Sequence, residues 1–338
     1  MKKLLGCLTV ALACMLLLRP QVVSVGVSNG LHICANAILP SLFPFFVLTE
    51  FWIQAGYTQR LSALAAPLTK RLFHLPGAAA SAVLLGMLGG YPMGAKTVAS
   101  LYKRRLLTKE EAENSLFFCC SAGPAFLVGV IGVGIFQRTL VGLVLYVIHI
   151  ASAFLVGFAV RPKTYEDKPA VMTEDTPLSE AIVSSIRQGG MTTISVCIFV
   201  MFFSVLGELC SAHVLPSGLL ELSKGADLLA KWDYPVQTKA ILSSGFVGFG
   251  GVCVLVQTVS ILREAGLSCK TYCIGKLLQA IISMVLTWIT LPFLPPSEPC
   301  FAPSVPAFDL ALPQTMSCLL LLLVFVKISS GKTQRNRI

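Results

Sequence analysis

Ionisable side chains inside apolar segments are the residues of this sequence with the clearest chemical potential. Glu50, Lys96 and Glu208 each lie in or at the end of a strongly hydrophobic stretch. A charge within a membrane span is costly, and such residues commonly bind substrates, ions or one another. We therefore expect Lys96 to pair with Glu50 or Glu208, or to bind an anionic ligand. The alternative is that both glutamates lie at the membrane interface and that Lys96 extends toward it.

Lys96 directly follows a cluster of residues that break helices. The apolar stretch LLGMLGGYPMGAKTVASLYKRRLLTKEE places glycines and a proline in the middle of an otherwise helical pattern. Unpaired backbone groups are costly in lipid, so such a break persists only where it is buried in protein or lines a wet cavity. We expect a second half-helix to begin near Gly94 and to direct its free N–H groups at an anionic or carbonyl-bearing ligand. Close helix packing is the simpler alternative. The candidate residues here are Gly89, Gly90, Tyr91, Pro92, Gly94 and Lys96.

Two further segments have the same design. CCSAGPAFLVGVIGVGIF interrupts an apolar run at Ser121, Gly123 and Pro124, and GFVGFGGVCVLVQTVSIL interrupts another at Gly250 and Gly251. Both interruptions predict cavity-lining backbone, by the same argument as the first. These five residues are therefore candidate substrate-binding positions.

Part of the sequence repeats. At a shift of 161 positions, two Gly-Gly pairs, a Thr-Val pair and a lysine align in order, and at a shift of 158 VLTEF aligns with VLGEL. Two copies of a broken helix in one membrane chain are typical of secondary transporters. The aligned candidates are Gly89 with Gly250, Gly90 with Gly251, Lys96 with Gln257 and Glu50 with Glu208. Gln257 thereby joins the candidate site. The sequence leaves open whether the copies are parallel or inverted.

Composition places the chain in a membrane. Of its 338 residues, 55% are hydrophobic and only 12% are charged, with a mean hydropathy of +0.79, whereas soluble domains carry about 25% charged residues. We predict an all-α polytopic membrane protein with about eight hydrophobic segments and two pseudo-repeats, each containing glycine-broken helices that are re-entrant or discontinuous. The net charge of +10 indicates basic cytoplasmic loops and not a nucleic-acid surface.

The expected organisation follows the apolar runs and the one long polar break. An uncleaved N-terminal helix is expected over 1–20, although a secretory signal is the alternative interpretation of this basic and then apolar start. The remaining units are a first repeat over 21–160, a polar linker over 161–177, a second repeat over 178–296, and a Pro-rich loop with a last span and a basic tail over 297–338. Both termini are expected in the cytoplasm.

Metal, disulfide and catalytic signatures are weak. The twelve cysteines fall mostly in apolar runs, and neither Cys119-Cys120 nor the pair Cys269 and Cys273 has the spacing and partners of a zinc site. The four histidines are scattered, with no nucleophile at a useful spacing. We therefore expect no metal, no cofactor and no enzyme activity, catalysis by an intramembrane enzyme being the least favoured hypothesis.

The quoted motifs resemble a known family. ILPSLFPFFVLTE, GGYPMGAKTVASLYKRRLLTKEEAE, CCSAGPAFLVGVIGVGIF and GFGGVCVLVQTVSIL together are similar to the sporulation integral membrane protein YlbJ family, which carries the nucleoside-recognition (Gate) domain. The same domain name is used for segments of concentrative nucleoside transporters and of the ferrous-iron transporter FeoB. The resemblance implies a role in spore formation and a nucleoside-like ligand. Family members tend to have an Asn-rich turn where this chain has Cys119-Cys120-Ser121, which departs from the pattern.

Two functions from different classes remain at this point. The first is translocation of a small solute, a nucleoside or an ion, at a central site where the breaks meet. The second is a structural role in a spore-envelope assembly, without transport. In either case the expected partners are the lipid bilayer, a small-molecule or ion substrate for the transporter, and further copies of this chain or other membrane proteins. The expected location is the cell membrane.

Overall fold

The computed structural model describes residues 2–163, 177–209 and 213–293, and in these ranges the chain is helical with no β-strand. The first half contains α1 (Lys2–Leu18), α2 (Pro20–Ile33), η1 (Cys34–Ile38), α3 (Leu39–Gln54), α4 (Tyr57–Leu68), η2 (Thr69–Phe73), α5 (Ala79–Gly89), α6 (Met93–Lys103), α7 (Lys109–Ser115), η3 (Ala125–Val133), α8 (Gly134–Phe136) and α9 (Thr139–Ala159). The second half contains α10 (Leu178–Leu209), α11 (Val214–Leu220), α12 (Leu222–Lys231), α13 (Val236–Phe249), α14 (Gly251–Glu264), α15 (Lys270–Thr290) and η4 (Leu291–Phe293).

Length and composition make the chain a multi-pass membrane protein. Five helical stretches are long and apolar enough to cross a bilayer, and three shorter apolar helices accompany them within the described residues. The spans cover 20–54, 139–159, 178–209, 236–264 and 270–290. The prediction of an all-α fold with about eight hydrophobic segments is confirmed. The last span and the basic tail expected over 297–338 lie outside the described residues, as does most of the linker expected over 161–177.

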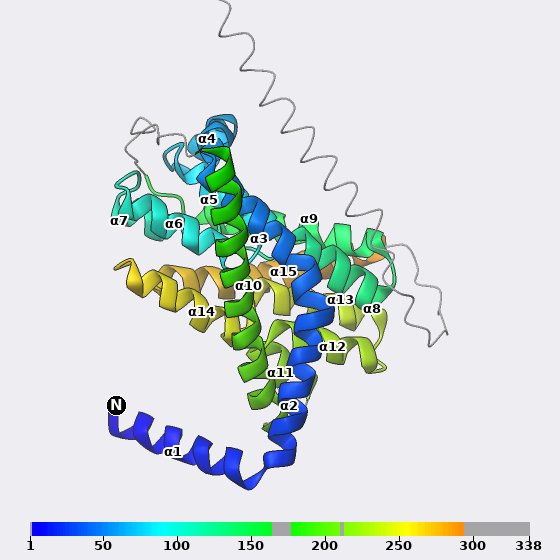
Figure 1. Cartoon of the computed structure of the whole chain (residues 1–338). Helices are drawn as coiled ribbons and strands as arrows, with labels where there is room; N and C mark the ends of the chain where they lie inside the picture. The colour runs from blue at the N-terminus through cyan, green and yellow to red at the C-terminus, as the bar shows by residue number, and fades with distance from the viewer. Residues whose placement is uncertain (1, 164–176, 210–212, 294–338) are drawn as a thin grey trace, which may run out of the picture.

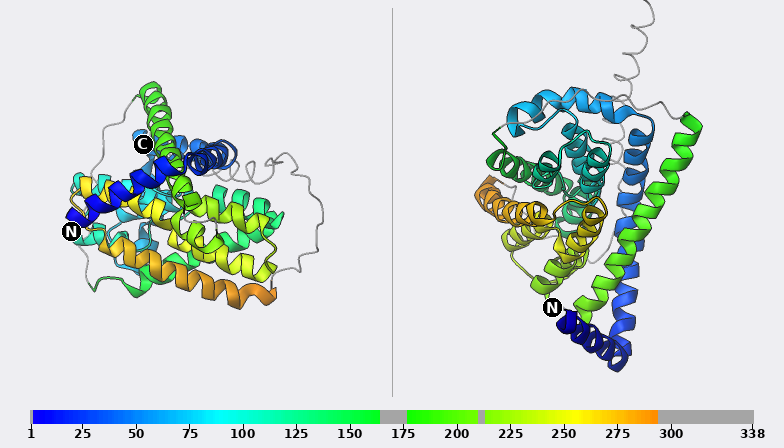
Figure 2. Two further views of the ribbon diagram at one scale, coloured as in Figure 1. Left: turned by 90° about the horizontal axis from the view of Figure 1, so that it is seen from below. Right: turned by 90° about the vertical axis from the view of Figure 1, so that its left-hand side faces the viewer.

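Two long helices pack side by side at one edge of the molecule. Helices α2 and α3 form one continuous rod through η1, and this rod lies along α10 (Figures 1 and 2). A Cβ atom at Gly30 would lie 2.8 Å from the Cα of Met201, so glycine allows the two backbones to approach closely. The π-helical η1 ends at Ile38, two residues before Pro40, and its wider turn accommodates a residue that has no N–H to donate. We call these helices the long pair.

The remaining helices form a bundle with a repeated order of elements. In the first half, α5 and α6 pack against each other as a hairpin, followed by the interrupted helix α7–η3 and then by α9, which packs against η3. In the second half, α11 and α12 form a hairpin, followed by the interrupted helix α13–α14 and then by α15, which packs against α13. Helices α9 and α15 pack together where the halves meet. The predicted pair of repeats with broken helices is therefore present.

Corresponding elements run in opposite directions. The α6–α7 and α14–α15 turns lie together at one end of the bundle, joined by a 2.9 Å hydrogen bond from the Ser268 N–H to Glu113. The α8–α9 and α12–α13 turns lie toward the other end, where α8 packs against α12 (Figure 1). Hence α7–η3 leaves the first end whereas α13–α14 arrives there, and the repeat is inverted.

The register of the repeat differs from the sequence alignment. A shift of 161 places α5–α6 over α13–α14, but α5–α6 is a hairpin and α13–α14 is an interrupted span. The hairpin α11–α12 is the structural counterpart of α5–α6. The alignment matched the Gly-Gly pairs because both kinds of break need glycine at the residue that leaves the helix. The equivalence of Glu50 and Glu208 holds in the structure, because both lie near the C-terminal ends of the long pair.

Candidate functional site

The chain interruptions meet one another in the centre of the bundle. A Cβ atom at Gly90 would lie 2.8 Å from the backbone N of Gly123, so the α5–α6 tip touches the break in α7–η3. A Cβ atom at Gly250 would lie 3.4 Å from the ring of Tyr91, and one at Gly251 would lie 3.3 Å from the carbonyl oxygen of Leu220. Both hairpin tips and both interrupted helices therefore converge on one place.

The first hairpin tip has a backbone that only glycine adopts readily. Gly90 has φ +77° and ψ −169°, a region essentially reserved for glycine. The Tyr91–Pro92 peptide bond is cis, and α6 begins at Met93. The hairpin also closes tightly against the next interruption: a Cβ atom at Gly94 would lie 2.3 Å from the carbonyl oxygen of Cys119. The apolar run thus turns back at this point because its glycines remove the side chains that would prevent it.

A small cavity of about 50 Å³ lies at the convergence. Polar side chains line it from both hairpin tips and from the interrupted helix α13–α14. Apolar side chains of the long pair line the rest of it. Its polar lining is Tyr91, Glu221, Ser223 and Gln257, and its apolar lining includes Ile38, Leu42, Phe126, Val196, Val200 and Cys253, with Ala122 and Gly123 contributing backbone. A buried water needs roughly 10–15 Å³ of such space, so the cavity has room for a few water molecules.

Glu221 supplies the cavity with a carboxylate. It is 2% exposed and caps the N-terminus of α12. Its Oε1 accepts the N–H of Ser223 at 2.9 Å and its Oε2 accepts the N–H of Lys224 at 2.6 Å. Each carboxylate oxygen has a second acceptor position, so Glu221 can still bind a hydroxyl or an N–H of a ligand.

An open groove of about 380 Å³ adjoins the cavity. It lies between α6, α10 and α14 and reaches Glu264, the last residue of α14. Its polar lining is Lys96, Arg187, Gln188, Thr192, Ser195, Gln257, Ser260 and Glu264. Gln257 lines both the groove and the cavity. The two spaces are therefore neighbours, with the Gln257 side chain between them.

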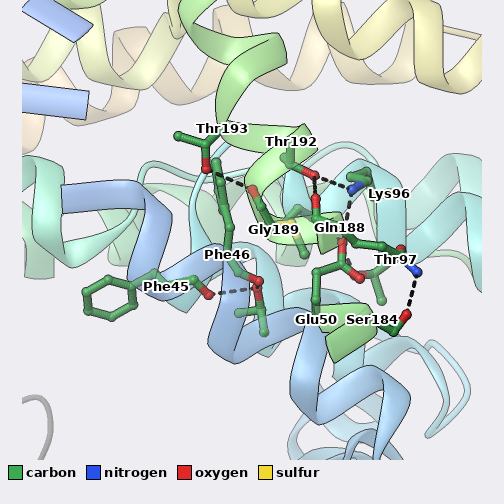
Figure 3. A network of polar contacts seen from close by, with 12 residues as sticks. Phe45, Phe46, Glu50, Lys96, Thr97, Ser184, Gln188, Gly189, Thr192 and Thr193 are labelled. Atoms are coloured by element: carbon green, nitrogen blue, oxygen red, sulfur yellow. Dashed lines mark hydrogen bonds and ion pairs between the residues drawn. The ribbon is translucent and has the colours of Figure 1, made fainter. Parts of the chain in front are cut away.

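Lys96 makes one of the two predicted ion pairs. Its Nζ lies 3.0 Å from Oε1 of Glu50 and donates to Oγ1 of Thr192 at 2.7 Å (Figure 3). The lysine side chain is 33% exposed to the groove, whereas the glutamate side chain is 6% exposed. The pair joins α6 to both helices of the long pair.

Glu208 has a different partner. Its Oε1 lies 2.6 Å from Nζ of Lys224 on α12 and accepts from Asn29 on α2 at 2.9 Å. The alternative pairing of Lys96 with Glu208 is therefore absent. Neither Glu208 nor Glu50 lines the cavity or the groove as described above, so the two glutamates connect elements and do not face these spaces.

The other predicted residues lie at the convergence with distinct roles. Tyr91, Gly123 and Gln257 line the cavity, and Pro92 and Gln257 line the groove. The hydroxyl of Ser121 is buried and makes no hydrogen bond with the described residues. Gly89 ends α5 and Pro124 directly precedes η3. The structure thus brings the predicted glycine breaks together around one site.

Sequence reasoning missed four polar residues of this region: Glu221, His149, Lys276 and Gln279. His149 Nε2 accepts the N–H of Ala122 at 3.0 Å, which pairs a backbone group of the broken segment. Lys276 and Gln279 lie one turn apart on α15 and are fully buried. For His149 and Lys276 the available signal is their position inside predicted spans, where an ionisable residue is a functional candidate. Glu221 lies outside the predicted spans and Gln279 is uncharged, so neither has this signal.

Comparison with known proteins places this architecture. The family model described as "Gate: Nucleoside recognition" matches residues 36–214, more than half of the chain. The chain belongs to the Gate family. The sporulation integral membrane protein YlbJ of Bacillus subtilis (strain 168) is 26% identical to this Gate-family chain over 318 residues, which cover 80% of this chain and 78% of YlbJ.

Solved structures share the fold of this Gate-family chain. CNTnw in an inward-facing, substrate-bound state aligns with a TM-score of 0.55 at 14% identity, covering 86% of this chain and 84% of CNTnw. A double variant of CNTnw in an outward-facing state aligns with a TM-score of 0.51 at 16% identity and the same coverage. Family, relative and fold together show a Gate-family membrane protein with the fold of CNTnw.

Proposed function

We propose that this protein moves a small polar solute of the nucleoside class through the membrane. The observation that carries the proposal is the convergence of both hairpin tips and both interrupted helices on a cavity that is lined by Glu221 and shares Gln257 with a surface groove. Transporters commonly bind their substrates where broken helices of inverted repeats meet. The description of the Gate family as nucleoside recognition favours a nucleoside over an ion.

The lining suits an uncharged solute that has several hydrogen-bond donors. A carboxylate accepts hydrogen bonds only, whereas the Gln257 amide both donates and accepts. The hydroxyls of a sugar and the N–H groups of a base would satisfy such groups. The cavity itself is too small for such a molecule, because small-molecule sites measure about 300–1,000 Å³. The groove, at about 380 Å³, falls in this range. A solute would therefore enter the groove first, and the hairpin tips would separate to admit it.

Uptake by the purified protein in proteoliposomes tests the proposal. Radiolabelled purine and pyrimidine nucleosides should enter faster than into protein-free liposomes. The Glu221→Gln variant should lower uptake at subsaturating solute by about 10-fold or more, because a hydrogen bond to a charged group contributes about 1.5–3 kcal/mol. Glu180→Gln, the same change at an exposed position of α10, should leave uptake unchanged.

The competing function is a structural role in an envelope assembly, and the name of the curated relative favours it. Folded protein that neither binds nor imports any nucleoside of the panel would contradict transport and support this alternative. Equal loss of uptake in both variants would instead mean that Glu221 has no specific role.

A further inference from the structure

Lys276 is the charged residue that the proposed transport path does not explain. It is fully buried on α15 and lines neither the cavity nor the groove as described. Its Nζ donates to Oη of Tyr91 at 2.6 Å, to the carbonyl oxygen of Cys120 at 2.9 Å and to Oε1 of Gln279 at 2.6 Å. Within the described residues it forms no ion pair.

The neighbours of Lys276 are arranged as acceptors for an ammonium group. Tyr91 donates its hydroxyl hydrogen to the carbonyl oxygen of Val247 at 3.0 Å, so its oxygen accepts from Lys276. The Cys120 carbonyl accepts only. The amide nitrogen of Gln279 donates to the carbonyl oxygen of His149 at 3.2 Å, which directs the amide oxygen to Lys276. Three acceptors around one nitrogen match the three N–H donors of an ammonium.

The surroundings of this ammonium resemble those of a coordinated monovalent cation. Its ligands are a hydroxyl, a peptide carbonyl and an amide oxygen, and the Tyr91 ring centroid lies 4.8 Å away. Proteins bind dehydrated monovalent cations with neutral oxygens, and broken helices supply free carbonyls for this purpose.

The ammonium connects interruptions from both halves of the chain. Cys120 belongs to the break in α7–η3, Tyr91 is the tip of the α5–α6 hairpin, and Val247 lies in the last turn of α13 before Gly250. Lys276 donates directly to the Cys120 carbonyl, and its partner Tyr91 donates to the Val247 carbonyl. Without Lys276 the Cys120 carbonyl would lose this hydrogen bond in an apolar medium, which is costly.

We propose that Lys276 is a built-in cation: its ammonium fills an oxygen cage formed by Tyr91, Cys120 and Gln279, and so makes the core independent of dissolved monovalent cations. This inference does not rest on the proposed transport. It concerns the stability of the folded protein, and its test needs no substrate.

Thermal unfolding of the purified protein in detergent tests it. The chloride salts of sodium, potassium, methylammonium and N-methyl-D-glucamine are compared at equal ionic strength. The wild-type melting temperature should be the same in all four. Lys276→Ala should melt lower in N-methyl-D-glucamine chloride, by on the order of 5 °C, and should recover at least half of this loss in sodium or methylammonium chloride, because these cations are small enough to enter the emptied cage.

Three further variants keep the test decisive. Lys276→Met fills the space without a charge and should be destabilised without recovery in any salt. Lys276→Ala combined with Tyr91→Phe removes one cage oxygen and should recover less than Lys276→Ala alone. Lys231→Ala removes an exposed lysine and should show no salt response.

Two results would overturn the proposal. One is a wild-type melting temperature that depends on sodium, which can be measured even if Lys276→Ala cannot be purified. The other is a folded Lys276→Ala variant whose melting temperature responds to none of the cations.

Discussion

At the scale of single residues, the two ion pairs that join the long pair to the bundle differ in which partner is buried. In the Lys96–Glu50 pair the acid is the buried member, with side chains 33% and 6% exposed. In the Lys224–Glu208 pair the base is more buried, at 4% against 16%. Removing one partner leaves the other uncompensated, and the cost rises with the burial of the group that remains.

These exposures predict opposite orders of destabilisation in the two pairs. Lys96→Met should destabilise more than Glu50→Gln because it leaves a buried carboxylate, whereas Glu208→Gln should destabilise more than Lys224→Met because it leaves a buried ammonium. The larger effect in each pair is expected to reach about 3 kcal/mol. Melting temperatures of the four purified variants measure this. The same order in both pairs, for example both lysines costing more, would contradict the explanation by burial.

At the scale of elements, the glycine breaks differ in how strictly they need glycine. Gly90 combines a backbone conformation reserved for glycine with close contact to Gly123. Gly250 has φ +84° and ψ −11°, and an added Cβ would meet the Tyr91 ring at an ordinary contact distance of 3.4 Å. Gly266, in the α14–α15 turn, has φ +73° and open space around it. The three positions therefore separate backbone strain from crowding.

We predict that Gly90→Ala destabilises most, and that Gly250→Ala and Gly266→Ala cost similar and smaller amounts. Gly250→Ala and Gly266→Ala place alanine in a left-handed backbone conformation, which costs about 1–2 kcal/mol. Gly90→Ala in addition displaces the α7–η3 break. Thermal stability of the three variants in one detergent provides the comparison. A Gly90→Ala variant as stable as Gly266→Ala would show that the hairpin tip can move away from Gly123 at little cost.

At the scale of the whole molecule, the basic residues are concentrated at one end of the bundle. The two turns at that end carry or adjoin Lys103, Arg104, Arg105, Lys109, Arg263 and Lys270, whereas those toward the other end adjoin Arg138, Lys231 and Lys239. Because lysine and arginine accumulate on the cytoplasmic side, we expect the first end to face the cytoplasm. The groove, which reaches Glu264 at this end, would then open inward.

Cysteine accessibility in cells measures this orientation. Arg104→Cys and Lys270→Cys, both exposed at the basic end, should react with a membrane-impermeant maleimide only in inside-out vesicles. Thr139→Cys and Asp233→Cys, exposed toward the other end, should react in intact cells. The wild-type chain with its native cysteines provides the background. Labelling of all four positions from one side would contradict the inverted arrangement of the two halves.

The sequence by itself determined the membrane class, the helical fold and the places where helices break. Hydrophobic composition indicates that the chain lies in a bilayer, and glycine and proline break helices through local backbone geometry. The membrane class and the helix breaks can therefore be predicted without coordinates. The sequence also predicted Glu50 as one of two possible partners of Lys96, because a charge inside a span requires a partner.

Only the tertiary structure decided which breaks meet and which residues surround them. The correspondence of hairpin with hairpin, the carboxylate of Glu221 in the cavity and the oxygen cage around Lys276 all depend on contacts between segments more than a hundred residues apart. Residue type and local spacing contain no information about such contacts, because they arise from how two inverted halves pack together and not from the conformation of either segment.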